Sequence, residues 1–207
     1  MNYLAHIYLA RQSDDAMLGG LLGDFVKPHS GLQFTPEIEA EILTHRKIDS
    51  FTDSHPILLQ GRELFEGPSR RYAGILLDVF YDHLLATHWS TYSQVPLEAF
   101  IGRFYTVLSA RADSLPPALA QVAPRMIEQD WLGSYRTFSG VEIAINRTST
   151  RLSKNGHLLR NGLVDLKAHY AALAVGFHAF FPDLIAFVDS RRQDQRAGDG
   201  DSNEVSN

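Results

Sequence analysis

Residues 75–86 have the sequence Ile-Leu-Leu-Asp-Val-Phe-Tyr-Asp-His-Leu-Leu-Ala, and this stretch decides the fold. At about 100° per residue, apolar side chains fall on every face, which predicts a central and largely buried helix over about 69–89. Asp82 shares one face with Ile75 and Val79, and Asp78 and His83 lie on its flanks. An ionised carboxylate in a buried helix is costly unless it is paired or bound to a cation, so these polar residues indicate a site.

The segments on either side carry further helix signals. Thr35-Pro36-Glu37 predicts the start of a helix over 36–53, which His55-Pro56 ends. Ser139 and Glu142 have the spacing of a capping box and predict a helix through residue 152. Residues 3–9 fit a strand or a helix. Further helices are expected over 13–26, 97–113, 117–130 and 163–181, the last of them stopping at Pro182.

These signals predict an all-α fold, a single compact helical domain over residues 1–188. A chain of 207 residues suits one domain. From residue 189 onward almost no apolar side chain remains, so residues 189–207 are expected to form a disordered polar tail.

Composition excludes several functional classes. The chain has no cysteine, which excludes disulfides, thiolate metal sites and a cysteine nucleophile. A net charge of −5 disfavours nucleic acid as a partner. The N-terminal residues make a poor signal peptide, and no run approaches the roughly 20 apolar residues that span a bilayer. A cytoplasmic protein without a membrane partner is therefore expected.

Metal-ligand residue types continue the apolar face of the helix over 36–53. Ile38 and Ile42 define that face, and steps of three and four residues extend it to His45 and Asp49. A further carboxylate, Asp24, follows a glycine-rich apolar run. Carboxylate and imidazole ligands suit a hard divalent cation such as Mn²⁺ or Mg²⁺, with Fe²⁺ a further option. The predicted metal ligands are Asp24, His45, Asp49, Asp78, Asp82 and His83.

Each of these residues also has an ordinary structural interpretation. A histidine four residues before an aspartate is often a surface pair, and aspartates beside arginines are often structural ion pairs. His6 lies in an apolar segment, and its position is equally consistent with a histidine of the core and with a residue of the site. Arg147 and Arg151 could grip a phosphate or an acidic partner, although a solvated helix face accounts for them more simply.

Several segments, in order and spacing, resemble the acyl carrier protein phosphodiesterase family over nearly the whole chain. They are Met1-Asn2-Tyr3-Leu4-Ala5-His6, Gly23-Asp24-Phe25-Val26, His45-Arg46-Lys47-Ile48-Asp49 with Thr52-Asp53, Leu77-Asp78-Val79-Phe80-Tyr81-Asp82-His83, Trp89, and His169-Tyr170 through Phe181-Pro182.

This resemblance implies a helical fold distantly related to the HD-domain phosphohydrolases, and a divalent cation, typically Mn²⁺. It implies hydrolysis of holo-acyl carrier protein to the apo form and 4′-phosphopantetheine, and so a place in lipid metabolism. The chain has no His-Asp dipeptide, and Asp82-His83 has the reverse order. The ligands of the wider HD superfamily therefore cannot be transferred to it.

The residues expected to take part in catalysis are Asp24, His45, Arg46, Asp49 and Asp82, with Arg46 stabilising charge on the phosphoryl oxygens. An acidic carrier protein requires a basic docking surface, for which Arg70, Arg71, Arg147, Arg151 and Arg160 are available. Two alternatives stay open. One is an HD-type phosphohydrolase acting on a nucleotide or another small phosphoester, and the other is a non-catalytic helical binding module.

Overall fold

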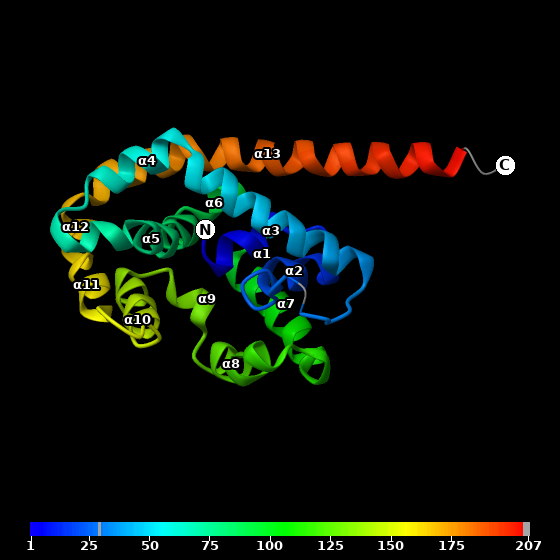
Figure 1. The fold of residues 1–207 in the computed structure, drawn as a ribbon, viewed down its shortest axis with the longest axis horizontal. Helices are drawn as coiled ribbons and strands as arrows, with labels where there is room; N and C mark the ends of the chain where they lie inside the picture. Colours follow the sequence, from blue (N-terminus) through cyan, green and yellow to red (C-terminus); the bar gives the residue numbers. More distant parts are fainter. Residues whose placement is uncertain (29, 205–207) are drawn as a thin grey trace.

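A computed structural model describes residues 1–28 and 30–204, and within these residues the regular secondary structure is helical (Figure 1). The all-α prediction is confirmed. The α-helices are α1 (Tyr3–Leu9), α2 (Asp14–Leu22), α3 (Pro36–Ser54), α4 (Pro56–Glu63), α5 (Ala73–Thr87), α6 (Trp89–Tyr92), α7 (Leu97–Ala110), α8 (Pro117–Glu128), α9 (Trp131–Ser134), α10 (Phe138–Ser149), α11 (Gly156–Asn161), α12 (Leu163–Ala168) and α13 (Tyr170–Glu204), with 3-10 helices η1 (Gly67–Tyr72) and η2 (Ala112–Ser114).

Helix α5 is the buried centre of the fold, as its sequence predicts. It contacts α1, α4, α10, α12 and α13, and η1 precedes it. Leu76, Phe80, Leu84 and Leu85 are fully buried, and Asp82 is equally inaccessible to solvent. A buried carboxylate in this position needs hydrogen-bond donors, and the neighbouring helix α1 supplies them.

Helices α1, α2 and α3 pack closely at the site. Residues 3–9, for which the sequence allows a strand or a helix, form α1. Gly20 lets α2 approach α1, because a Cβ at this position would lie 2.9 Å from the carbonyl oxygen of His6. Helix α3 begins as predicted, with the Thr35 side chain accepting a hydrogen bond from the backbone N–H of Ile38. The close packing brings side chains from α1 and α3 together.

Several predicted helix boundaries are wrong. Helix α10 begins one residue before Ser139, because Thr137 is the residue whose side chain caps it, by accepting from the N–H of Gly140. The helix predicted over 163–181 is two helices, since the chain breaks at His169 between α12 and α13. Helix α13 also continues through Pro182. Proline there removes one hydrogen bond to the carbonyl of His178, and His178 is exposed to solvent that can replace it.

The chain stays helical where a disordered tail is predicted. Helix α13 extends beyond the other helices in Figure 1, to Glu204. Arg192 donates from Nη2 to both carboxylate oxygens of the buried Glu41 in α3, at 3.0 and 3.1 Å. The tail prediction is therefore wrong for residues 189–194, because an ion pair that the sequence does not reveal holds them. Its last residues, 205–207, lie outside the described part of the chain.

Among the residues that the structure describes, one helix is long and apolar enough to cross a membrane by length and composition alone. It is the stretch Tyr170–Asp194 of α13, and 33% of its most apolar window is buried in the protein. The expectation that no segment reaches this threshold is therefore not met. A core helix of a soluble protein has the same properties, so the finding does not assign α13 to a membrane.

Candidate metal centre

His6 reaches the site because Asp82 fixes the start of α1. The first backbone N–H groups of a helix have no partner within the helix, and a helix of seven residues is marginal in isolation. The Asp82 carboxylate accepts from the N–H of Leu4 at 2.7 Å and from that of Ala5 at 3.0 Å. Asp82 therefore caps α1 from α5 and holds the His6 ring against α3.

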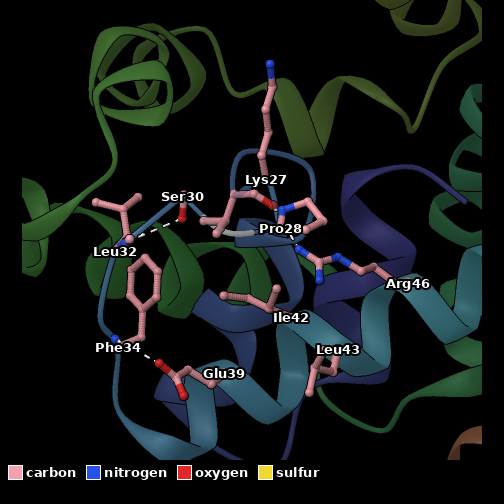
Figure 2. Close-up of a pocket in the computed structure, with 11 residues that line it drawn as sticks. Lys27, Pro28, Ser30, Leu32, Phe34, Glu39, Ile42, Leu43 and Arg46 are labelled. Atoms are coloured by element: carbon pink, nitrogen blue, oxygen red, sulfur yellow. Dashed lines mark hydrogen bonds between the residues drawn. The ribbon is translucent and has the colours of Figure 1, made fainter.

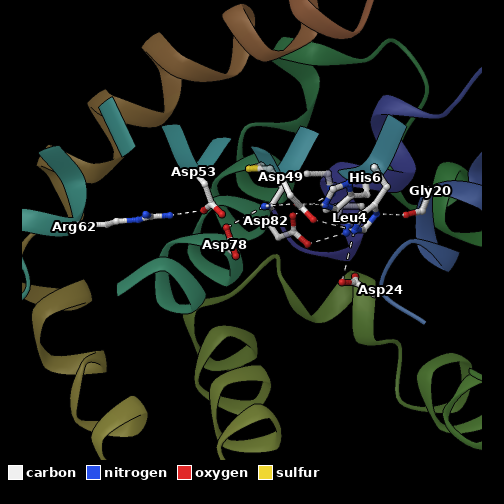
Figure 3. A network of polar contacts seen from close by, with 12 residues as sticks. Leu4, His6, Gly20, Asp24, Asp49, Asp53, Arg62, Asp78 and Asp82 are labelled. Carbon is white, nitrogen blue, oxygen red and sulfur yellow. Dashed lines mark hydrogen bonds and ion pairs between the residues drawn. The ribbon is translucent and has the colours of Figure 1, made fainter. Parts of the chain in front are cut away.

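His45 and Asp49 lie one turn apart on α3. Figure 3 shows Asp49 beside His6. Nδ1 of His45 donates to the carbonyl oxygen of Gly20 at 2.7 Å, which directs Nε2 toward the carboxylates. That Nε2 lies 3.2 Å from Oδ2 of Asp49 and 3.7 Å from Oδ1 of Asp24. Nε2 of His6 lies 3.1 Å from Oδ1 of Asp49, and the two histidine rings stack with centroids 3.6 Å apart. Two imidazoles and a carboxylate thus converge.

Burial and charge give the two histidines opposite protonation states. Burial lowers the pKa of His6, and the charge of His45 lowers it further, to about 4, so His6 is neutral. Burial also acts against the charged form of His45, but hydrogen bonds to Asp24 and Asp49 outweigh it and raise its pKa to about 9. Burial opposes ionisation of Asp49 as well, yet its hydrogen bonds to His45 and His6 hold its pKa below its usual range. A proton on His45 thus links two carboxylates.

These residues fit a divalent cation. One ligand atom from each of His6, His45 and Asp49 lies within 4.8 Å of the others. The backbone carbonyl that orients His45 is the kind of partner that metal-binding histidines use, and imidazole with carboxylate suits Mn²⁺ or Fe²⁺. Nδ1 of His6 is buried without a hydrogen-bond partner among the described residues. A cation could therefore replace the proton on His45 and satisfy the same carboxylates.

The positively charged amino group of Met1 lies beside these residues. Its nitrogen lies 3.0 Å from Oδ1 of Asp78 and 3.6 Å from Oδ1 of Asp49 and is shielded from solvent. Burial acts against the charged amine, but Asp78 and Asp49 outweigh it and raise its pKa to about 10. Asp49 is therefore shared between the amino group and the histidines.

The structure brings two of the predicted metal ligands, His45 and Asp49, together with His6. Asp24 lies at the edge of this group, with Oδ1 3.7 Å from Nε2 of His45. Asp78 pairs with the Met1 amino group and Asp82 caps α1, so neither belongs to the group of potential ligands.

His83 and Arg46 have other surroundings. Nδ1 of His83 lies 2.7 Å from the carbonyl oxygen of Tyr135 and Nε2 lies 2.9 Å from the Tyr170 hydroxyl, so both ring nitrogens already have partners. The predicted ligand role of His83 stays a prediction. Arg46 donates to the carbonyl oxygen of Val26 at 3.0 Å.

Arg46 also lines a cavity of about 270 Å³ between α3 and the chain that follows Asp24 (Figure 2). The lining is mainly apolar, with Phe34, Ile42 and Leu43 among its residues. His45 precedes Arg46 in sequence, but none of His6, Asp24, His45 and Asp49 lines the cavity.

The fold and the site define a class: an all-helical protein in which two buried histidines and a partly exposed aspartate suit a divalent cation. Residues 1–184 match the family model described as acyl carrier protein phosphodiesterase, and the chain belongs to this family. The sequence-based identification and the prediction of an enzyme that hydrolyses a phosphodiester are thereby confirmed.

Relatives in Salmonella agona (strain SL483), Salmonella newport (strain SL254) and Salmonella enteritidis PT4 (strain P125109) carry the name acyl carrier protein phosphodiesterase. Each is 35% identical over 187 residues, which cover 90% of this chain and 96% of the relative. No solved structure matches the chain. The relation to the HD-domain phosphohydrolases therefore stays a prediction.

Proposed function

We propose that this protein hydrolyses the phosphodiester that joins 4′-phosphopantetheine to holo-acyl carrier protein, and that it needs a divalent cation to do so. The family and the names of the relatives support the carrier protein as substrate. The observation that carries the metal dependence is the convergence of His6, His45 and Asp49.

His45, Asp49 and His6 would hold the cation, each through one ligand atom. When bound, the cation supplies Lewis acidity toward a phosphoryl oxygen and toward water. The mixed imidazole and carboxylate set favours Mn²⁺, with Fe²⁺ next and Mg²⁺ last, because Mg²⁺ prefers oxygen ligands.

Asp24 is suited to move the proton. Its side chain is 40% exposed, and Oδ1 lies 3.7 Å from Nε2 of His45. Asp24 would take a proton from water as the water oxygen attacks phosphorus, and the bond from phosphorus to the serine oxygen of the carrier would break. The proton then passes to that serine oxygen, so one water yields apo-carrier protein and 4′-phosphopantetheine.

Asp82 and Arg46 act differently in this proposal. Asp82 is a positioning residue, because both of its oxygens hold the start of α1 and through it His6. Arg46 donates from Nη2 to the carbonyl of Val26, and its other N–H groups could contact phosphoryl oxygens.

The test follows the mass of holo-acyl carrier protein incubated with metal-stripped protein, with and without Mn²⁺. The expected result is loss of the phosphopantetheine mass only with Mn²⁺, at least 100-fold slower with Asp49→Asn. The matched control is Asp113→Asn, an exposed carboxylate in η2 that should leave the rate unchanged. Equal rates without metal would contradict the metal dependence, and no mass change under any metal would contradict the substrate.

An HD-type phosphohydrolase acting on a nucleotide or small phosphoester is the second candidate enzyme, since the same centre would serve it. Hydrolysis of such esters without carrier protein would favour it. A non-catalytic binding module would require that metal neither binds nor stabilises the fold.

A further inference from the structure

Three arginines lie in or directly after helices α8 and α10. Arg125 lies in α8, Arg147 in the last turn of α10 and Arg151 just after it. Burial lowers the pKa of the Arg147 guanidinium, and the charges of Arg151 and Arg125 lower it further. The three positive charges are therefore close enough to repel one another.

Neutral groups hold Arg147 in place. Its guanidinium lies over the Trp131 ring, 3.6 Å from the centroid, and Nη2 lies 3.4 Å from Oε1 of Gln129. Trp131 is itself buried and donates to the same Gln129 oxygen at 3.0 Å. The planar guanidinium is thus oriented without a carboxylate.

The arginines of this cluster differ from the paired arginines elsewhere. Arg103 and Arg136 each form an ion pair with a carboxylate, as do Arg62, Arg111 and Arg192. Within residues 1–28 and 30–194, no carboxylate lies within ion-pair distance of Arg125, Arg147 or Arg151. A cluster of three unneutralised guanidinium groups attracts an anion.

Tyr3 connects this cluster to the metal centre. Its ring stacks on Phe25, the residue after Asp24, with centroids 6.1 Å apart. Burial and the charge of Asp24 raise the pKa of the Tyr3 hydroxyl, while Arg151 and Arg147 lower it, so all three charged groups are near enough to act on it. The side chain of Asn2 donates to the Tyr135 hydroxyl at 2.6 Å and ties the start of α1 to the segment that carries Trp131.

We propose that Arg147 and Arg151, with the Tyr3 hydroxyl, form an anion site that binds the phosphoryl group of the substrate beside the metal centre, with Arg125 adding to its positive field. A guanidinium matches phosphate oxygens with two parallel N–H donors, and Tyr3 adds an O–H donor. The identity of the phosphoryl group as that of 4′-phosphopantetheine rests on the proposed function. The anion site itself rests on the arginines.

The test is calorimetric titration of metal-free protein with inorganic phosphate at low ionic strength, with pantetheine, which lacks the phosphate, as the neutral probe. We expect phosphate to bind and pantetheine not to bind. Arg151→Gln and Arg147→Gln should each weaken phosphate binding at least 10-fold. Arg147→Lys keeps the positive charge but loses the two parallel N–H donors of the guanidinium. Its affinity for phosphate should lie between that of the glutamine variants and that of the wild type.

Arg11→Gln is the matched control, because Arg11 also lies over an aromatic ring, that of Tyr8 at 4.3 Å, and has no carboxylate within ion-pair distance among the described residues. Circular dichroism shows whether each variant is folded, and Arg151 is exposed, so Arg151→Gln should not disturb the fold.

Two results would overturn the anion site: phosphate binding that is unchanged in Arg151→Gln and Arg147→Gln, or no phosphate binding at all. If phosphate does not bind but the same variants weaken the complex with holo-acyl carrier protein, the arginines are a protein-docking surface and the anion site is refuted. If phosphate binds through the arginines but Mn²⁺-loaded protein leaves holo-acyl carrier protein intact, the anion site stands and the proposed function fails.

Discussion

The orientation of His45 depends on the absence of a side chain at Gly23. A Cβ at position 23 would lie 2.1 Å from Cγ and 2.5 Å from Nδ1 of His45. Carbon atoms in contact prefer about 3.5–4.0 Å, so Gly23→Ala requires the ring to retreat by roughly 1.5 Å. The backbone of Gly23, with φ −52° and ψ −34°, suits alanine, so the effect of the substitution is steric alone.

The retreat breaks a specific contact. Nδ1 of His45 lies 2.7 Å from the carbonyl oxygen of Gly20. A shift of the ring by roughly 1.5 Å would move these two atoms beyond hydrogen-bond distance. Overpacking costs about 1–3 kcal/mol, and a buried unpaired group about 1–3 kcal/mol more. We expect Gly23→Ala to lower the free energy of unfolding by about 2–6 kcal/mol. Loss of the group that orients a ligand should weaken Mn²⁺ binding by about 10–100-fold.

Urea unfolding followed by circular dichroism measures the first effect, and calorimetric titration with Mn²⁺ the second. The matched control is Gly102→Ala in α7, where a Cβ meets nothing within 4 Å. Alanine there should stabilise the helix by about 0.5–1 kcal/mol and leave Mn²⁺ binding unchanged. The reasoning is refuted if Gly23→Ala matches the wild type in stability, or if it is destabilised but binds Mn²⁺ with unchanged affinity.

Three further predictions concern the carboxylates of the site. Asp49→Asn should weaken Mn²⁺ binding by about 10–100-fold in calorimetry, and unchanged binding would remove Asp49 from the ligand set. Adding Gly-Ser before Met1 replaces the buried ammonium by an amide and leaves Asp78 without its cation. Because Asp78 is 35% exposed, we expect the free energy of unfolding in urea to fall by only about 1–3 kcal/mol. An unchanged free energy of unfolding would contradict the buried ion pair. Burial raises the pKa of Asp82 to about 7 despite its backbone hydrogen bonds, above its unfolded value, so its contribution to stability is present at low pH and lost as pH rises through 7. Relative to Asp82→Asn, the wild type should therefore lose stability between about pH 4 and 7, by at most about 1.4 kcal/mol per pH unit, and parallel stability curves would refute this.

Much of the helical framework could be predicted because its signals are local. Thr35 caps α3 where the sequence places it, and α5 is buried as its continuous apolar composition predicts. Prediction failed where the competing interaction comes from elsewhere in the chain. Arg192 keeps α13 in place through Glu41, 151 residues away in sequence, and a tail that looks disordered by composition is helical there.

In the candidate site, too, some features could be predicted from local sequence and others depend on contacts between helices. The sequence by itself determined that His45 and Asp49 share a helix face, because helix geometry fixes the positions of residues four apart. Only the tertiary structure decided that His6 joins them, that Asp82 caps α1, and that His83 faces Tyr135 and Tyr170. Side-chain direction within one helix follows from local backbone hydrogen bonds, whereas the contacts between helices depend on how α1, α3 and α5 pack, which no short stretch of sequence encodes.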